Sequence, residues 1–466
     1  MVSRRGVLAP EYFLTTVGAC ALVFLAAFES MAVTTIMPLV SQDLDGAALY
    51  ALAFAGPLAS GVIGMVLAGM WTDRSGPKGP LFASVAVFAA GLVLAGLATN
   101  MPVFLAGRLV QGLGAGAINV VLYVLIARLF PPILHPRIFA AFAAAWVVPS
   151  MVGPFCAGLV AQALSWHWVF LGVVVLVIPA LVMLLPAVRK LDAGQPGGDL
   201  QGAEEEQAGT STQPPTTPPK TPVSAPLRLG LAAVVALAVL GLNLSVELGA
   251  WAWPAAGLAI AVAVLAVRPL LPAGTLRARR GLPTAVLLRG LMSAAFFGAE
   301  VYVPYLLIDH YGFSPSIAGL ALTFSALAWA LGSNLQGRFT VRLTSAVALR
   351  IGTAALTACV SGIFLAALAG WPPVVIMVIW ILGGGAMGLA YPRLTVSILS
   401  LSTPDNQGFN SSAGSVSDAV GGALSMAMTG LLFHAVAGLS FPAVFALTVL
   451  IAVLALIVAP RLAVRG

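Results

Sequence analysis

The sequence has few charged residues. Only 8% of its 466 residues are Asp, Glu, Lys or Arg, whereas 60% are hydrophobic, and the mean hydropathy is +1.04. No soluble domain hides so large an apolar fraction from water. The apolar runs are long and lack the alternation of barrel strands. The sequence therefore predicts an all-α polytopic membrane protein.

Cysteine and histidine are also scarce, and each absence excludes a class of site. Cys20, Cys156 and Cys359 all lie in apolar runs, so they fit neither a disulfide framework nor a CxxC metal site, and the four histidines are scattered. No metal or other cofactor is expected. A phosphate-binding G-x-x-x-x-G-K-[ST] pattern does not occur, which argues against an ATP-driven pump. The net charge is +7, but the basic residues mark loops rather than one nucleic-acid-binding surface.

The apolar runs divide the chain into spans. About 20 mostly apolar residues cross a membrane as a helix. Fourteen runs meet this length: 12–40, 47–71, 79–98, 101–129, 137–163, 166–187, 228–247, 250–271, 283–308, 313–338, 345–369, 372–400, 405–436 and 440–460. The first run is too long for a signal peptide and lacks a cleavage site, so we interpret it as a retained helix.

One segment between spans differs in composition from the rest. Residues 191–226 contain Glu204-Glu205-Glu206 and a Thr/Pro-rich tract, which bury too little to fold. We predict a cytoplasmic disordered linker there. Residues 1–190 then form an N-terminal six-helix bundle, 227–272 two inserted transmembrane helices, and 273–466 a C-terminal six-helix bundle.

The two bundles resemble each other in sequence. The segment Gly69 to Arg74 is echoed by Gly332 to Arg338, where Gln336 replaces the acid, and the glycines of 111–116 are echoed by 382–388. Repeated helix bundles are typical of secondary transporters, whose substrate site lies between the repeats.

The basic residues predict the orientation. With the N-terminus inside, all but two of the 22 Lys and Arg residues fall on the inner side, Arg228 and Arg289 among them. The other two, Arg108 and Arg393, lie within spans. We therefore predict a multi-pass protein of the cell membrane with both termini cytoplasmic.

Ionisable side chains inside the spans are the leading functional candidates, because such groups are costly in a membrane. They are Glu29, Arg108, Glu300, Arg393 and Asp418. A carboxyl group at low dielectric favours its neutral form and can exchange a proton. The alternative for each acid is a structural hydrogen bond to a neighbouring helix. Arg108 keeps its charge and needs an anionic or carbonyl partner, whereas Arg393 lies near enough to the inner surface to snorkel.

A polar stretch from Gly69 to Leu81 carries the first family resemblance. It resembles the loop between helices 2 and 3 of the major facilitator superfamily, G-x-L-a-D-R-x-G-R-K, through Gly69, Asp73, Arg74, Gly76 and Lys78, with Pro77 in place of an arginine. The resemblance implies a major facilitator fold with two inserted helices. It also implies a gating role for Asp73 against the helix that begins near 402–405. Gln336 lacks the charge, so we expect a weaker latch in the second half.

Three further patterns resemble the fourteen-span drug:proton antiporters of that superfamily. Glu29 stands nine residues before Pro38, as the acid does in L-D-x-T-x-V-N-V-A-L-P. Arg108 begins R-x-x-Q-G-x-G, a pattern tied to proton coupling. The stretch 149–158 is similar to G-x-x-x-G-P-x-x-G-G through Pro149, Gly153, Pro154 and Gly158, with Pro149 replacing the first glycine and Ala157 the penultimate one.

These resemblances imply a proton-coupled secondary transporter that exports amphipathic or cationic small molecules, a multidrug efflux antiporter. Glu29, Arg108, Asp418 and Glu300 are the expected proton-coupling residues, the proton gradient is the energy source, and a monomer is expected. Two alternatives remain: an exporter of lipids or lipid conjugates, and a non-transporting membrane scaffold or receptor. Aromatic residues are candidates for the cavity lining or for packing: Tyr123, Trp146, Phe296, Phe297, Tyr302, Tyr305, Trp380 and Tyr391.

Overall fold

The computed structural model describes residues 6–46, 49–192, 224–313, 315–339, 344–435 and 440–462, and within these ranges it is helical without strands. Its helices include 14 that are long and apolar enough to cross a membrane. This agrees with the fourteen spans predicted from the apolar runs. Large apolar side chains remain exposed along them, among them Val175, Leu176 and Ile178. Such side chains suit a surface that faces lipid.

The helices form two halves and a pair between them. The first half consists of α1 (Pro10–Asp43), α2 (Tyr50–Ser75), α3 (Lys78–Gly96), α4 (Met101–Leu129), α5 (His135–Ala163) and α6 (His167–Asp192). The pair is α8 (Ala225–Ser245) and α9 (Ala252–Val267). The second half consists of α10 (Leu282–Glu300), α11 (Tyr302–Asp309), α12 (Pro315–Arg338), α13 (Ser345–Ala369), α14 (Pro373–Ser400), α15 (Gln407–Ala435) and α16 (Ser440–Val458). Helices α10 and α11 abut at Val301 and together form one span.

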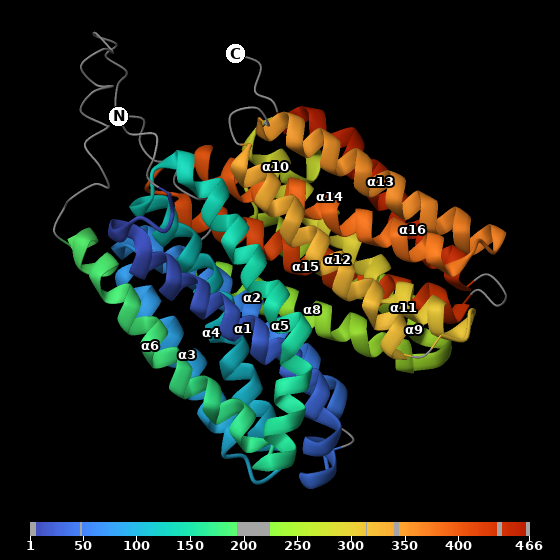
Figure 1. Ribbon diagram of the computed structural model, residues 1–466, viewed down its shortest axis with the longest axis horizontal. Coiled ribbons are helices and arrows are strands. Elements are labelled where there is room, and N and C mark those ends of the chain that lie inside the picture. The colour runs from blue at the N-terminus through green and yellow to red at the C-terminus, as the bar shows by residue number, and fades with distance from the viewer. Residues whose placement is uncertain are drawn as a thin grey trace.

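Each half has its own apolar core. One core is built from α1 to α6, with Phe88, Phe104 and Phe170 among its fully buried side chains, and the other from the second half, with Phe296 and Trp380. The halves lie side by side at the end where α2 and α4 terminate and diverge toward the opposite end (Figure 1). The hydrogen bonds described below between the two halves join residues at or toward the end where the halves meet.

The repeat predicted from the glycines has a packing basis. Gly116 of α4 lies directly against Gly61 of α2, and Gly388 of α14 lies directly against the backbone of Trp329 on α12. A methyl group at either glycine would overlap the facing backbone, so these two helix pairs approach at equivalent places in the two halves.

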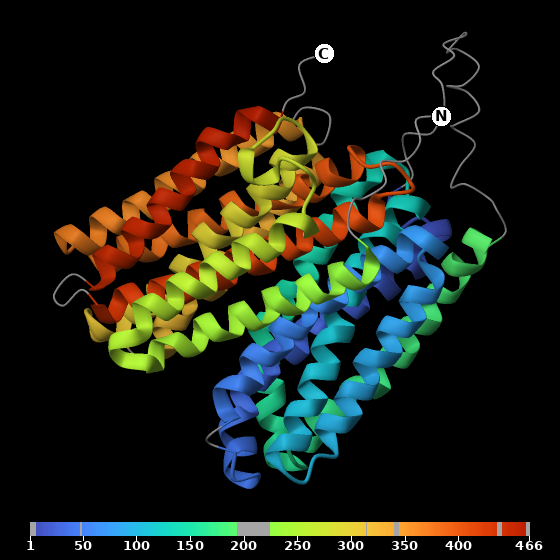
Figure 2. The same ribbon diagram turned by 180° about the vertical axis from the view of Figure 1, so that it is seen from behind.

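The inserted pair lies across the junction between the halves (Figure 2). Helix α8 packs chiefly against α9 and α2. Val235 and Val239 of α8 join Val62 and Val66 of α2 in the core of the second half. The other end of the pair packs on α15, through a small cluster of Leu242, Ala252, Ala256, Ala427 and Leu431. Most of the predicted linker, 193–223, lies outside the described residues, and α8 begins at Ala225, just before the predicted boundary.

The polar stretch between α2 and α3 is shorter than the sequence pattern indicated. Helix α2 continues to Ser75, so Asp73 and Arg74 belong to its last turn. The turn itself is Gly76, with a positive φ of 77°, and Pro77, before α3 begins at Lys78. Only glycine adopts that φ without strain. Helices α2 and α3 are therefore joined by a turn of two residues.

Candidate functional site

Glu29 and Arg108 form a buried ion pair. Each is 5% exposed, Glu29 on α1 and Arg108 on α4. Nη1 of Arg108 donates to the Glu29 carboxylate and, at 2.5 Å, to Oε1 of Gln111, while Nε donates to the carbonyl of Ala53 on α2 at 3.3 Å. The guanidinium thus ties three helices together, and the anionic partner that the sequence analysis required for Arg108 is Glu29.

The antiporter-like stretch of α5 lies against the same part of α1. The position that a methyl group would take on Gly153 falls 3.5 Å from Cβ of Met31 and 3.6 Å from the ring of Phe28. These two residues flank Glu29 in the sequence. Pro149 is buried, and Pro154 is inside α5, whose helix continues to Ala163. Gly158 has open space around it. Gly153 therefore packs on α1 against the sequence neighbours of Glu29, whereas Gly158 does not depend on close packing.

A second ion pair lies in the other half. Nε of Arg289 on α10 is 3.9 Å from Oδ2 of Asp418 on α15. The Arg289 guanidinium lies over the rings of Tyr123 and Tyr391, 5.3 and 5.2 Å from their centroids. It donates to Oγ1 of Thr395 at 3.0 Å and to the Tyr123 hydroxyl at 3.1 Å. Because Tyr123 belongs to α4, this cluster joins the two halves.

Arg289 is the functional candidate that the sequence analysis missed. It was assigned to the inner-side basic residues, but it is 2% exposed and lies within α10. Its position inside the predicted span 283–308 was the available signal. A charged residue inside a membrane span requires a partner, and Asp418 provides one.

Asp73 joins α2 to the start of α15. Its two carboxylate oxygens accept hydrogen bonds from the backbone amides of Gly408, at 2.6 Å, and Phe409, at 2.7 Å. The first amides of a helix have no partner within the helix and carry the positive end of its dipole, so a carboxylate is favoured there. The expectation that Asp73 lies against this helix end agrees with the structure, although α15 begins at Gln407 rather than at Asp405.

Other residues near Asp73 differ in their burial and in their contacts with the start of α15. Gly69 packs against Gly408, leaving no room for a side chain. Arg128 at the end of α4 donates to the carbonyl of Pro404 at 3.1 Å. Arg74 and Lys78 are exposed at the surface.

Gln336 forms a corresponding contact in the second half. Its Nε2 donates to the carbonyl of Pro136, at the start of α5, at 3.2 Å, and the side chain is fully buried. We expected a weaker contact in the second half because Gln336 lacks the charge of Asp73. The partner of Gln336 is a carbonyl acceptor, to which an amide can donate and a carboxylate cannot. Arg393 is 3% exposed and donates to the carbonyl of Gln336 at 2.9 Å, so it does not snorkel.

The remaining candidates are less closely connected. Glu300 is half-buried at the end of α10 and has no ion pair among the described residues. Phe296 and Trp380, which were candidates for a cavity lining, stack on each other with centroids 4.7 Å apart inside the core. Trp146 is 47% exposed. Of the predicted aromatic set, Tyr123 and Tyr391 lie at the junction of the halves.

Comparison with known proteins identifies the architecture. The model of the Major Facilitator Superfamily matches residues 19–426. The chain belongs to the Major Facilitator Superfamily. The family resemblance drawn from the motifs is thereby confirmed, and the chain is a multi-pass membrane transporter of this superfamily.

Relatives within the superfamily include efflux proteins. A probable multidrug-efflux transporter of Mycobacterium tuberculosis is 26% identical over 404 residues, which cover 84% of this chain and 80% of the relative. The multidrug efflux pump SdrM of Staphylococcus aureus is 24% identical over 172 residues, or 37% of this chain and 38% of the pump.

Solved structures share the fold. The human organic anion transporter MFSD10 superposes with a TM-score of 0.67 at 16% identity, covering 97% of this chain and 99% of that chain. The proton:xylose symporter XylE gives a TM-score of 0.63 at 15% identity, covering 95% and 94%. At this identity the likeness concerns the fold alone.

Proposed function

We propose that this chain is a proton-coupled antiporter that exports amphipathic or cationic small molecules by alternating access. The observation that carries the proposal is the buried pair of Glu29 and Arg108. Arg108 is a permanent cation, whereas the carboxyl group of Glu29 can gain and lose a proton. The similarity to multidrug efflux transporters supports the substrate class.

Because the halves meet at one end and diverge at the other, we can propose an order for proton binding, opening and substrate binding. In our proposal the end where α2 meets α3 faces the cytoplasm, both termini are cytoplasmic, and the protein acts as a monomer in the cell membrane. The structure then represents a state closed to the cytoplasm. A proton from outside neutralises Glu29, and Arg108 keeps Gln111 and the Ala53 carbonyl as partners. The halves then open toward the cytoplasm, where Glu29 releases its proton and the substrate binds.

The proton gradient drives this exchange without another cofactor. One charge that crosses the membrane potential contributes about 2.3 kcal/mol per 100 mV. In the simplest scheme one proton enters and one substrate leaves in each cycle, because the substrate binds where Glu29 has released its proton and the two are not carried together.

Asp418 is the proposed second proton site. Its partner Arg289 also holds the Tyr123 hydroxyl of the other half. Protonation of Asp418 removes the negative charge that balances Arg289, and this alters a contact that must change when the halves move. Glu300 is a further auxiliary site in this proposal because it lies half-buried in the same half.

The experiment that tests the function measures proton release. Purified protein in weakly buffered detergent is titrated with tetraphenylphosphonium, a lipophilic cation, and the pH change is recorded. We expect release from the wild type, a smaller release from Glu29→Gln, in which Asp418 is the remaining proton site, and unchanged release from Asp405→Asn, a control at an exposed acid. Binding with full release from Glu29→Gln would remove Glu29 from the scheme.

The lipid-exporter alternative rests on the position of the inserted pair. Leu237, Leu258 and Leu265 of this pair are exposed beside the junction of the halves, where a lipid would enter laterally. Reconstituted vesicles distinguish the two functions. Proton-driven movement of a fluorescent phospholipid, without movement of tetraphenylphosphonium, would favour lipid export. Movement of neither compound under a proton gradient would favour a non-transporting role.

A further inference from the structure

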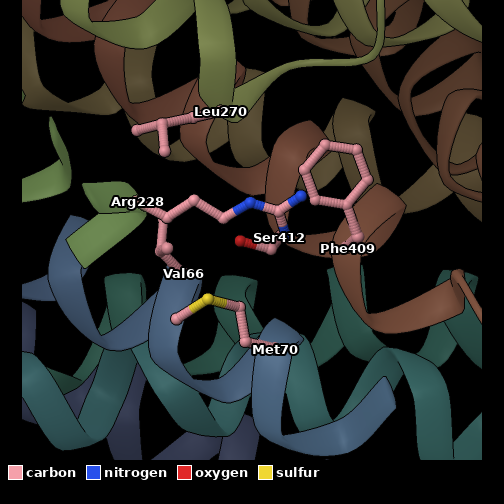
Figure 3. A pocket seen from close by; sticks show the side chains of 6 residues that line it. All are labelled: Val66, Met70, Arg228, Leu270, Phe409 and Ser412. Atoms are coloured by element: carbon pink, nitrogen blue, oxygen red, sulfur yellow. The ribbon is translucent and has the colours of Figure 1, made fainter. Parts of the chain in front are cut away.

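The inserted helices reach the contact that closes one end of the transporter. Arg228 lies in the first turn of α8, yet it is only 7% exposed. Its guanidinium lies over the ring of Phe409 on α15, 4.8 Å from the centroid. Figure 3 shows the side chain extending from α8 toward Phe409 and Ser412, in a pocket that Val66, Met70 and Leu270 also line.

Two different helices therefore hold the same residue of α15. The backbone amide of Phe409 donates to Asp73 of α2, while the face of its ring receives Arg228 of α8. Because α8 packs chiefly against α9 and α2, Arg228 extends across the junction to a helix of the second half.

We propose that Arg228 makes the inserted helix pair part of the gate at the α2–α15 contact, where it stabilises the closed state. A guanidinium over an aromatic ring, away from water, is held by a short-range attraction. Any movement that separates the start of α15 from α2 also removes Phe409 from beneath Arg228. The inserted pair thus favours the state in which this end is closed, and it must release Phe409 before the end opens.

This inference rests on the alternating-access function proposed above, and the test separates the two. Spin labels are placed at Ser75→Cys and Asp405→Cys, exposed positions on either side of the contact, after Cys20, Cys156 and Cys359 are replaced by alanine. Electron–electron double resonance then gives the populations of short and long distances in nanodiscs. Asp73→Asn serves as the reference variant for opening of the gate.

We expect Arg228→Gln to raise the population ratio of long to short distances at least about fivefold, within the range of cation–π contacts in proteins. Phe409→Leu keeps the backbone amides that bind Asp73 and should give a similar rise. In the double variant Arg228→Gln/Phe409→Leu, the ratio of long to short distances should be no higher than in either single variant. If the two substitutions only reduced stability in general, their effects on this ratio would add. Arg268→Gln, at an exposed arginine after α9, should match the parent.

Two outcomes would overturn the inference. If Asp73→Asn opens the gate while Arg228→Gln and Phe409→Leu do not, the inserted pair has no part in it. If the effects of the Arg228 and Phe409 substitutions are additive, the two side chains do not act through their contact. An unchanged distance in Asp73→Asn as well would contradict both this gate and the proposed alternating access. Substrate-induced proton release in Arg228→Gln, where Glu29 is intact, reports separately on the antiport function.

Discussion

Glu29 and Arg108 stand 79 positions apart in the sequence and meet as an ion pair between α1 and α4, with both side chains buried. A buried pair of this kind is costly to form, and removing one partner leaves the other charge uncompensated. The two partners differ in one respect. An unpaired Glu29 can become neutral by binding a proton, whereas an unpaired Arg108 cannot lose its charge.

This difference predicts that the stability of one single variant depends on pH and that of the other does not. For Arg108→Gln, we expect the free energy of unfolding to fall as the pH rises, by up to about 1.4 kcal/mol per pH unit. The reason is that folded Glu29 then retains a proton that the unfolded chain releases. Glu29→Gln should be destabilised by about 3–5 kcal/mol at every pH. Thermal unfolding in detergent at acidic and alkaline pH measures both. Arg350→Gln, at an exposed site, is the control, and a flat profile for Arg108→Gln would contradict the ion pair.

The packing of Gly69 predicts a steric effect on the gate. A methyl group at Gly69 would lie 2.6 Å from the carbonyl oxygen of Gly408, so Gly69→Ala should prevent α2 and α15 from closing fully. We expect maleimide labelling of Ser412→Cys at the gate, in a background without the native cysteines, to become at least about fivefold faster, a shift of about 1 kcal/mol. Gly158→Ala, where the added methyl has open space, should label at the parent rate. Equal rates in all three proteins would show that the Gly69 contact does not limit closure.

The helices were predictable because the membrane imposes a simple rule on the sequence. Apolar runs of about 20 residues become spans, and the predicted run 345–369 coincides with α13, Ser345–Ala369. The Asp73 contact was also predictable, because the family pattern was present around it. The break between α10 and α11 was not, since the apolar run is continuous through Val301.

Arg228 and Arg289 were missed for the same physical reason. Orientation was predicted by assigning basic residues to the inner side, and a charge count does not distinguish an exposed arginine from one buried near the same end. Arg228 and Arg289 were both assigned in this way, yet both are buried against aromatic rings of other helices. The partner of Gln336 was not predictable, because the identity of its acceptor, a carbonyl on α5, depends on tertiary packing.

Asp418 and Arg289 predict a change in proton coupling. If Asp418 carries a second proton, Asp418→Asn should lower the proton-to-substrate ratio from about two to about one. A given pH gradient would then sustain a substrate ratio about tenfold lower per pH unit. Reversal-potential measurements in proteoliposomes give this ratio directly. Ser417→Ala, which removes only a hydroxyl that donates to the Val286 carbonyl, is the neighbouring control. An unchanged ratio in Asp418→Asn would restrict this acid to a structural role.

Gln336 gives a final test, in which restoring the acid of the family pattern should weaken the gate. The Gln336 amide donates to the Pro136 carbonyl at 3.2 Å. In Gln336→Glu the ionised carboxylate of equal size cannot donate and faces a carbonyl oxygen. The closed state should therefore lose about 1–3 kcal/mol at neutral or higher pH, the cost of an unmade buried hydrogen bond. The closed state should recover its stability as pH falls, because a protonated carboxyl donates again.

Spin labels at Arg137→Cys and Phe339→Cys report the distance between α5 and α12 at this end. Gln336→Ala, which cannot recover at low pH, is the matched control. A closed population in Gln336→Glu that exceeds the parent's at high pH would mean that charge, not donor geometry, governs the contact.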